Sequence, residues 1–288
     1  MKLSSTLHTA TRALARNKMR SLLTALGIII GVASVIAMVS VGNGAKGQVE
    51  AQIAALGRNV LIVMSGNITR SGINTGWGGA GTLTLEDARA VAREVTGVSS
   101  TSPEVRQGIQ IAANGQNWFT QVLGESPDYF RIRDWPLTEG EPFSERDNSS
   151  AAKVVILGAT VSSQLFGARS PLGEVIRIGK VPFKVVGVLS RKGTSLMGSD
   201  QDDTVIIPYT SAMKRVTGST NLRSIQVQAE TADKMESVQQ QIISLLRQRH
   251  HITPGRDDDF MVRSQNDIAQ MATATSRKIG RASCRERV

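Results

Sequence analysis

The amino-acid sequence predicts an α+β protein in which an N-terminal transmembrane helix precedes a mixed α+β domain of two subdomains. Residues 22–41 form an apolar run with no charged residue and no proline. Beyond this run, short segments with strand character mix with short helical segments in no regular order, which favours an α+β arrangement over an alternating α/β one. The one cysteine, Cys284, excludes a disulfide framework and a paired-cysteine metal site.

The apolar run, LLTALGIIIGVASVIAMVSV, has the length of a membrane-spanning helix. At about 1.5 Å per residue, such a helix covers roughly the 30 Å of a bilayer's hydrocarbon core. A cleaved signal peptide would have a shorter apolar region and a clear small-residue cleavage site, and a buried soluble helix is rarely apolar over such a length. We therefore expect a transmembrane helix over residues 20–44.

Two features of the N-terminal segment concern the membrane. Gly27 and Gly31 form a small-xxx-small pair, which predicts a face where a second membrane helix packs; the alternative is that glycine is simply common in such helices. Over residues 1–19, leucine and alanine recur at helical spacing among basic residues. This pattern predicts an amphipathic helix on the cytoplasmic membrane surface.

The positive charge of the chain lies at its two ends. Residues 1–20 hold five basic and no acidic residues, and residues 277–288 hold five basic residues and one acid. About +1 of the net charge of +10 is left for the residues between them. Nucleic-acid binding needs clustered charge on the folded body, so we expect no nucleic-acid partner. The basic start predicts a cytoplasmic N-terminus and an exported main domain.

The exported domain is expected over residues 45–265, with a β-rich subdomain inserted at about 105–205. Asn114-Gly115 predicts a hairpin between strands at 109–112 and 118–123. Other strands are predicted at 59–64, 154–157, 175–178, 183–189, 204–207 and 224–229. Helices are predicted at 45–56, 84–95, 160–166, 211–216 and 232–249, and a flexible glycine-rich loop at 65–82. The aromatic residues expected in the core are Trp118, Phe119, Tyr129, Phe130 and Trp135.

No pattern in the sequence predicts catalysis or a cofactor. Gly179-Lys180 is followed by Val181 rather than Ser or Thr, so there is no phosphate-binding loop for ATP. His250 and His251 are expected to be solvated surface residues, and residues 257–259 a solvated acidic turn. We therefore expect no catalytic, cofactor or metal residue on this chain, and a protein that is not itself an enzyme.

Three stretches carry a resemblance to a known family. They are MRSLLTALGIIIGVASVIAMVSVGNGAKGQVEAQIAALGRNVLIV at 19–63, VVILGATVSSQLFG followed by PLG at 154–173, and FKVVGVLSRKGTSLMGSDQDDTVIIP at 183–208. Together they resemble the periplasmic-core permeases of ABC transporters, in the MacB-like branch of the FtsX/LolC superfamily. With the spacing between them, the resemblance covers almost all of residues 1–276.

The resemblance implies a permease subunit that couples ATP hydrolysis by a cytoplasmic ABC ATPase to periplasmic movement for export of macrolides, drugs or peptides. ATP and magnesium would then bind to the ATPase. The resemblance further implies a homodimer in the bacterial inner membrane, with a periplasmic main domain and a periplasmic adaptor protein as a further partner. Two alternatives stay open: a membrane-anchored regulator that activates a periplasmic partner, and a lipoprotein-release permease.

The chain departs from this family at both ends. No ATPase precedes the basic helix, so the ATPase is expected to be a separate subunit. Residues 266–276 are expected to form a helix leading toward a second transmembrane helix that is missing, and residues 277–288, RKIGRASCRERV, resemble a non-native tail. We expect that the chain as given cannot transport on its own.

The segment from Arg191 to Asp203 is the candidate partner-contact loop. It is polar, contains glycine and lies between two predicted strands, where binding residues often occur. The alternative is an ordinary solvated connection. Its candidate contact residues are Arg191, Leu196, Met197, Asp200, Asp202 and Asp203, with the two apolar side chains as the point of contact.

Overall fold

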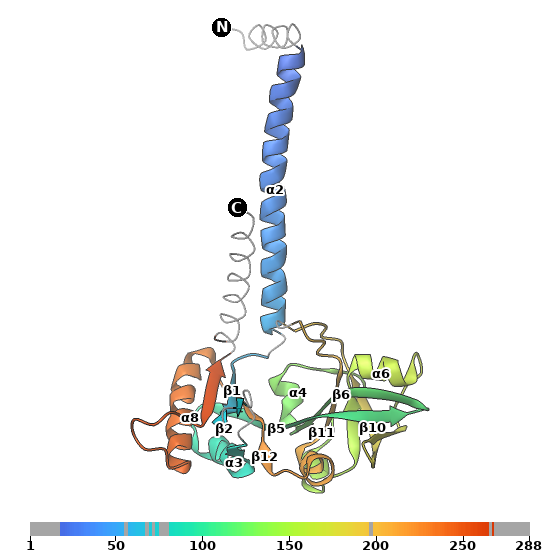
Figure 1. Cartoon of the computed structure of the whole chain (residues 1–288), viewed down its shortest axis with the longest axis vertical. Helices are drawn as coiled ribbons and strands as arrows, with labels where there is room; N and C mark the ends of the chain where they lie inside the picture. The colour runs from blue at the N-terminus through green and yellow to red at the C-terminus, as the bar shows by residue number, and fades with distance from the viewer. Residues whose placement is uncertain are drawn as a thin grey trace. The chain divides into compact units, whose positions relative to one another are not determined.

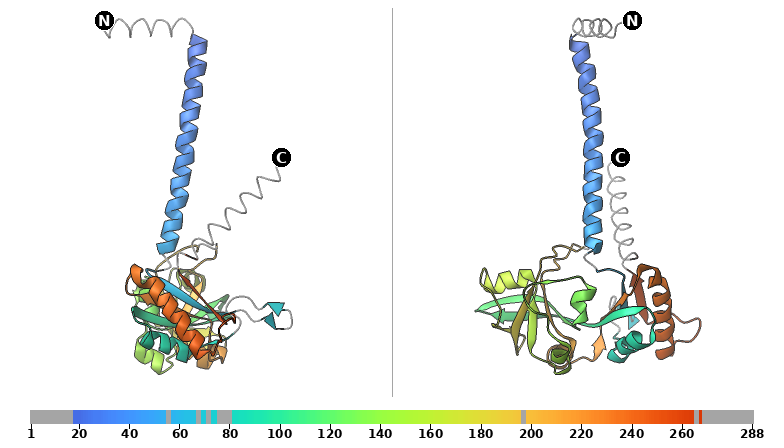
Figure 2. Two further views of the ribbon diagram at one scale, coloured as in Figure 1. Left: turned by 90° about the vertical axis from the view of Figure 1, so that its left-hand side faces the viewer. Right: turned by 180° about the vertical axis from the view of Figure 1, so that it is seen from behind.

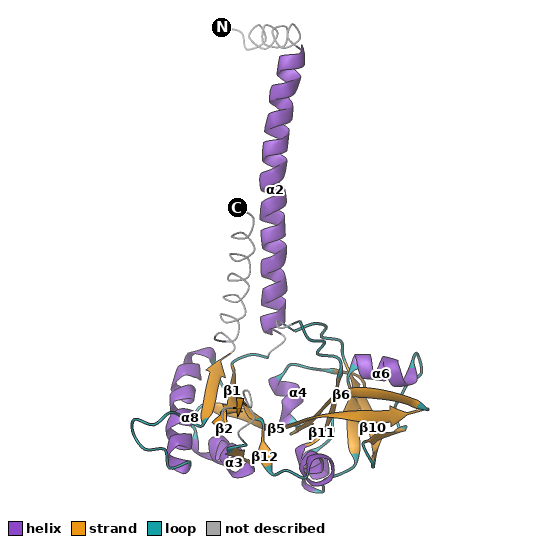
Figure 3. Cartoon of the chain, in the orientation of Figure 1, coloured by secondary structure: helices purple, strands orange, loops and turns teal. Residues whose placement is uncertain are grey.

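The computed structural model describes residues 18–54, 57–66, 69–70, 73–74, 81–195, 198–264 and 267. The chain divides into two compact units, Met1–Ala51 and Gln52–Val288. Figure 3 shows the mixture of helices and strands that the sequence predicts, and the predicted α+β class is confirmed.

The first unit is dominated by one long helix, α2 (Lys18–Ala54). Among the described residues it holds the one segment long and apolar enough to span a membrane, Leu22–Val41, with a mean hydropathy of 2.6. The large apolar side chains along this segment, such as Ile28 and Val35, are exposed. A Cβ atom added at Gly27 or Gly31 would meet nothing within 4 Å. The segment Leu22–Val41 is therefore apolar on all sides and exposed, as expected for a helix surrounded by lipid or by other membrane helices.

The second unit is built on a ten-stranded sheet, of which one half is a four-stranded antiparallel sheet. Its strand order is β14 (Phe260–Ser264), β1 (Val60–Ser65), β13 (Ser224–Ala229) and the first part of β5 (Val98–Ala113). Helices α3 (Leu85–Glu94) and α8 (Met235–Arg249) cover one face of this half (Figure 1; Figure 2). Apolar side chains of the strands, among them Leu61, Val63 and Ile225, are buried under these helices.

The other half is a ring of strands that closes on itself. From residue 105 onward β5 pairs with β6 (Gln116–Glu125), followed by β11 (Thr204–Pro208), β8 (Val154–Leu157) and β10 (Val181–Leu189). Strand β9 (Val175–Ile178) pairs with both β10 and β5, which completes a small barrel. Ile111, Ile178 and Phe183 are almost fully buried, and helix α6 (Ala159–Phe166) contacts β6, β10 and β11.

Local sequence signals explain where several elements begin and turn. Asn114 and Gly115 have φ values of 51° and 74°, as the two-residue turn of the predicted hairpin requires. The Thr84 side chain accepts a hydrogen bond from the backbone N–H of Asp87, and the Asp87 carboxylate accepts one from the backbone N–H of Thr84, so a capping box starts α3. The predicted hairpin and the predicted helix start near residue 84 are therefore confirmed.

Several shorter elements were not predicted. Helix α4 (Asp128–Ile132), helix α5 (Glu145–Ser149) and strand β7 (Leu137–Gly140) are four or five residues long. The helix predicted at 211–216 is present as helix α7 (Tyr209–Ser211) followed by a π-helix at Ala212–Thr217, and the helix predicted at 232–249 starts with a 3-10 turn at Ala232–Lys234 before α8. Two-residue strands pair as β2 (Thr69–Arg70) with β3 (Ile73–Asn74), inside the predicted loop, and as β4 (Leu83–Thr84) with β12 (Asn221–Leu222).

The aromatic residues divide into a buried group and one exposed ring. Tyr129, Phe130 and Trp135 are buried with Phe143 in a second apolar cluster at α4, where the Phe130 ring meets the rings of Tyr129 and Phe143 edge to face. Trp118 is partly buried against the main core. Phe119 is 65% exposed, so its predicted place in the core is wrong. It lies on the solvent face of β6, where its ring rests over Gly108 of β5.

Strand β5 passes through both halves of the domain. Residues up to Glu104 pair with β13, and residues from Val105 onward pair with β6. The two halves therefore share one continuous strand. The proposed subdomain at about 105–205 stays a prediction. The helices predicted over 1–19 and 266–276 and the tail at 277–288 lie almost wholly outside the described residues.

Candidate functional site

The face of the four-stranded sheet opposite α3 and α8 is polar. Along β5 and β13, side chains alternate between the two faces, so Ser102, Glu104 and Gln226 come to the same side and are all buried. Helix α4 contacts both strands on this side. A buried polar surface between a sheet and a short helix is unusual in a core, and it marks the place where the two halves of the domain meet.

Two carboxyl groups lie in this surface. Glu125, at the end of β6, is fully buried, and Ser102 donates a hydrogen bond of 2.6 Å to its Oε2. Burial, together with the neighbouring charge of Glu104, raises the pKa of Glu125 well above its ordinary value. Glu104 accepts a hydrogen bond from Gln226 at 3.2 Å and pairs with Arg106 at 3.1 Å. This pairing raises the pKa of Arg106.

A cavity of about 650 Å³ opens beside this surface, between the barrel and the segment from Ser195 to Thr204. A second cavity of about 260 Å³ adjoins it on the polar face of the sheet. Both are lined by Arg106, Tyr129, Arg133 and Arg223. We call the two cavities together the polar cleft.

The loop predicted to contact a partner forms one wall of the cleft. Asp202 is buried, and its carboxylate accepts hydrogen bonds from the backbone N–H groups of Lys192 at 2.8 Å and Gly193 at 3.0 Å. The carboxylate holds the two ends of the loop together, and a role for Asp202 as a partner contact stays a prediction. Arg191 is exposed, while Leu196 and Met197 lie outside the described residues.

Two further aspartates fasten the loop to the barrel. Asp200 accepts a hydrogen bond of 2.7 Å from Thr160 on α6, and Asp203 accepts one of 2.8 Å from the indole of Trp118 on β6. Both carboxylates also line or border the cleft. That the loop contacts a partner stays a prediction.

Lys192 anchors the start of the loop. Its ammonium group donates to the carbonyl of Arg133 and lies 4.9 Å from the centre of the Trp135 ring. Desolvation, followed by repulsion from Arg133, lowers the pKa of Lys192 to about 7. Trp135 in turn donates to the carbonyl of Ser190 at 2.7 Å. The loop is thus tied to the residues that follow α4.

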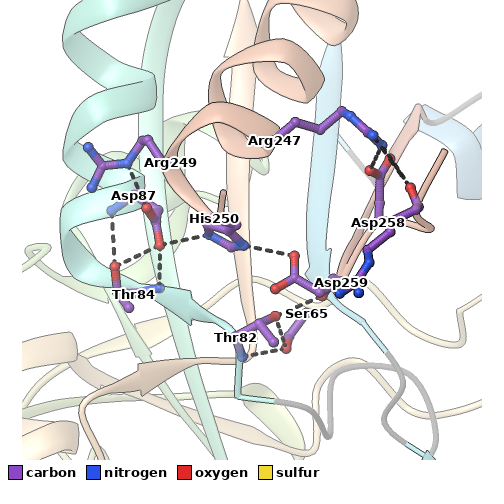
Figure 4. Close-up of polar contacts among 10 residues, drawn as sticks. Ser65, Thr82, Thr84, Asp87, Arg247, Arg249, His250, Asp258 and Asp259 are labelled. Atoms are coloured by element: carbon purple, nitrogen blue, oxygen red, sulfur yellow. Dashed lines mark hydrogen bonds and ion pairs between the residues drawn. The ribbon is translucent and has the colours of Figure 1, made fainter. Parts of the chain in front are cut away.

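A separate polar cluster joins α3, α8 and β14 (Figure 4). The His250 side chain is 9% exposed; its Nδ1 lies 2.7 Å from Asp259 and its Nε2 lies 3.3 Å from Asp87. Burial opposes ionisation of Asp87, but hydrogen bonds from Arg249 and Thr84 lower its pKa overall. The prediction of a solvated surface histidine is therefore wrong for His250, and the acidic turn supplies its partner.

The rest of this cluster fixes the neighbouring strand ends. Arg247 pairs with Asp258, and Thr82 donates to the carbonyl of Asp259 at 2.8 Å and contacts Ser65 at the end of β1 (Figure 4). Among the described residues no group of three or more His, Cys, Asp or Glu side chains is placed to hold a metal ion. The contacts of the cluster join α3, α8, the residues before β14 and the end of β1.

Sequence reasoning identified one wall of the cleft but missed the arginines and the buried carboxyl groups. A signal was present: Ser100, Ser102, Glu104 and Arg106 alternate with other residues, as do Ser224, Gln226 and Gln228. Such alternation places these polar side chains of each strand on one face. It did not show that this face is buried, because α4 is too short to be recognised from the sequence.

Comparison with known proteins agrees with this fold. A model of the MacB-like periplasmic core domain family matches residues 21–245. The chain is 33% identical over 329 residues to a macrolide export ATP-binding/permease protein MacB from Syntrophobacter fumaroxidans, covering 96% of the chain and 46% of the relative. A protein of the same name from Azoarcus is 38% identical over 267 residues, covering 93% of the chain and 39% of the relative. The chain thus spans less than half the length of these relatives.

Two solved structures show the same fold. The periplasmic region of MacB from Actinobacillus actinomycetemcomitans superimposes with a TM-score of 0.62 at 21% identity, covering 78% of this chain and 97% of that one. The extracellular domain of the transporter YknZ from Gram-positive bacteria gives 0.57 at 19% identity, covering 72% and 100%. With a family match over most of its length and relatives above 30% identity, the chain belongs to the MacB-like periplasmic core domain family of ABC transporter permeases.

Proposed function

We propose that this chain transmits movement between the membrane and an extracytoplasmic domain during ATP-driven export. The basic residues before α2 favour a cytoplasmic N-terminus, with the domain from residue 57 onward in the periplasm. ATP hydrolysis is assigned to an ABC ATPase, on another domain or another chain. Macrolides are the proposed cargo class because the relatives are named for their export.

The observation that carries this proposal is the short connection between α2 and the sheet. Helix α2 ends at Ala54 and β1 begins at Val60. Within the connection, Gly57 is buried with a φ of 94°, and a Cβ atom there would collide with the carbonyl of Ile132 at the end of α4. Gly57 is thus fixed where the connection enters the domain, and we infer that a shift of the helix is passed on at this point to β1 and α4.

Strand β1 distributes such a shift through the domain. It pairs with β13 on one side and with β14 on the other, for example Val63 with Val262. Both outer strands are buried or partly buried along most of their length. Movement that enters through β1 therefore passes first across the β1–β13 ladder and then across the β13–β5 ladder, and so reaches the polar cleft.

The proposed assembly uses two surfaces of the chain. The uncovered apolar face of α2 at Gly27 and Gly31 is the proposed contact with other membrane helices, including those of a second copy of the chain. The loop from Arg191 to Asp203 is the proposed contact for a periplasmic adaptor. The loop is fastened at its base by Asp202 and exposed at Arg191, as a docking loop on a rigid support would be.

An insertion in the connection tests the proposal. A four-residue Gly-Ser segment placed after Arg58 in the full permease should uncouple α2 from β1, because flexible linkers do not carry force. Macrolide resistance of cells should fall to that of cells without the transporter, while ATP hydrolysis and the folded domain persist. The matched control is the same insertion after Asp257, in an exposed loop, which should keep resistance. Full resistance with the insertion after Arg58 would exclude transmission through this connection.

A further inference from the structure

The polar cleft has the size of a small-molecule site. Its larger cavity measures about 650 Å³ and its smaller one about 260 Å³, and sites for small molecules span roughly 300–1,000 Å³. Strands β1, β5, β6 and β13, the end of α4 and the Ser195–Thr204 segment all contribute walls. Such a cleft, enclosed by several elements, suits a small molecule better than a protein surface.

Arginines from three elements meet where the two cavities join. Arg106 lies on β5, Arg133 follows α4 and Arg223 precedes β13, and each lines both cavities. Arg106 is paired with Glu104, but among the described residues the guanidinium group of Arg223 makes no hydrogen bond or ion pair. It is thus a cation with all its donors available. Guanidinium groups bind carboxylate and phosphate oxygens through paired hydrogen bonds.

The excess of positive charge lies in the smaller cavity. The carboxylates of Asp200 and Asp203, which line the larger cavity, accept hydrogen bonds from Thr160 and from the indole of Trp118. These donors are neutral, so both carboxylates keep their charge there. The smaller cavity is lined by all three arginines and by a single acid, Glu104, which favours a ligand that brings a negative charge to that end of the cleft.

Two further groups extend the site beyond the arginines. The side chain of Gln226 is more than nine-tenths buried and lines the smaller cavity, and its Oε1 atom has no hydrogen-bond partner among the described residues. It can accept a hydrogen bond from a ligand hydroxyl or amide. Beside the larger cavity, the exposed ring of Phe119 rests over Gly108, which lines that cavity.

From this arrangement we propose that the polar cleft binds a small organic anion, a carboxylate or phosphate attached to an apolar group. The anionic group lies against Arg223 and the neighbouring guanidinium groups of Arg106 and Arg133. The apolar group lies against Phe119. This site goes beyond the transmission of movement and does not depend on it.

Calorimetric titration of the 1–288 chain in a non-ionic detergent tests the proposal, with phenyl phosphate and 3-phenylpropionate as probes and benzyl alcohol as the uncharged probe. Both anions should bind saturably, and benzyl alcohol should not. Arg223→Gln should weaken the binding of both anions by about tenfold or more, since hydrogen bonds between charged groups are among the strongest in proteins. Arg256→Gln, at an exposed arginine that does not line the cleft, should change nothing.

A second variant examines the apolar contact and does not rely on the arginine. Phe119→Ala should weaken the binding of phenyl phosphate but leave that of inorganic phosphate unchanged. Thermal unfolding should be the same for all three variants and the parent, because each replaced side chain is exposed. The proposal is overturned if the anions do not bind saturably, if Arg223→Gln binds them as the parent does, or if benzyl alcohol binds as tightly as phenyl phosphate.

Discussion

At the scale of single residues, the buried carboxyl group of Glu125 makes the stability of the domain depend on pH. This group is fully buried and its pKa is raised well above the ordinary 4.5. Below about pH 4.5 the group is protonated in both the folded and the unfolded chain. As pH rises above that value, the unfolded chain loses this proton first, so the free energy of unfolding falls until the pH passes the raised pKa.

Glu125→Gln should remove this loss of stability. The amide keeps the shape and can still accept the hydrogen bond from Ser102, but it carries no titratable proton. We expect the parent to lose stability relative to the variant as pH rises from about 4.5 toward 8, measured as urea unfolding midpoints across that range. Glu174→Gln, at an exposed carboxyl group, is the control and should follow the parent. Parallel curves for Glu125→Gln and the parent would show that Glu125 ionises freely in the folded domain.

Single residues also show where sequence reasoning fails. His250 and His251 are adjacent and were expected to be alike, yet one is enclosed between two carboxylates and the other is exposed. Asp87 lies more than 160 positions from His250 in the chain, so no local pattern indicates the contact. The prediction that Phe119 lies in the core is wrong because its ring packs over Gly108 on the neighbouring strand, on the solvent face of the sheet.

At the scale of elements, His250 joins the end of α8 to the start of α3 and to the residue before β14. Replacing it by asparagine shortens the side chain and leaves two carboxylates without this partner. We expect His250→Asn to lower the free energy of unfolding by about 1–3 kcal/mol, the usual cost of leaving a buried polar group unsatisfied. Thermal or urea unfolding measures this loss.

His251→Asn is the matched control for this junction. His251 is exposed and has a φ of 55°, a left-handed conformation that asparagine tolerates. Its replacement should change stability by less than about 0.5 kcal/mol. Equal effects of the two replacements would mean that the histidine cluster does not hold α3, α8 and β14 together.

Helices and strands could be predicted where the sequence pattern that specifies them involves only residues close together in the chain. The hairpin at Asn114-Gly115, the capping box at Thr84 and the apolar periodicity of α8 all depend on neighbouring residues. Helices α4 and α5 are five residues long, too short for a helical period to show. The closure of the barrel depends on the pairing of β5 with β9. Such a long-range register is set by packing, and no sequence pattern reveals it.

At the scale of the whole molecule, the proposed orientation is open to a direct test. Alkaline phosphatase is active only outside the cytoplasm, so a fusion after Asp203 should be active and a fusion after Arg16 inactive. The physical reason is the retention of the basic residues before α2 on the cytoplasmic side. Immunoblots should show equal amounts of both fusions. Activity in the reverse pattern would overturn the orientation, and with it the proposed role in export.

The continuous strand β5 also sets a rule for building chimaeras from this domain and its relatives. A graft of the barrel alone would cut the strand between Glu104, which pairs with Ser224, and Val105, which pairs with Gly124. The chimaera would then contain a β5 strand whose first part comes from one protein and whose second part comes from the other. The junction would fall where Glu104 and Glu125 are buried together. Exchange at this joint would bring mismatched polar partners into a buried position, where each unsatisfied group costs about 1–3 kcal/mol. The smallest part that can be exchanged intact is therefore the whole domain, including the strand that both halves share.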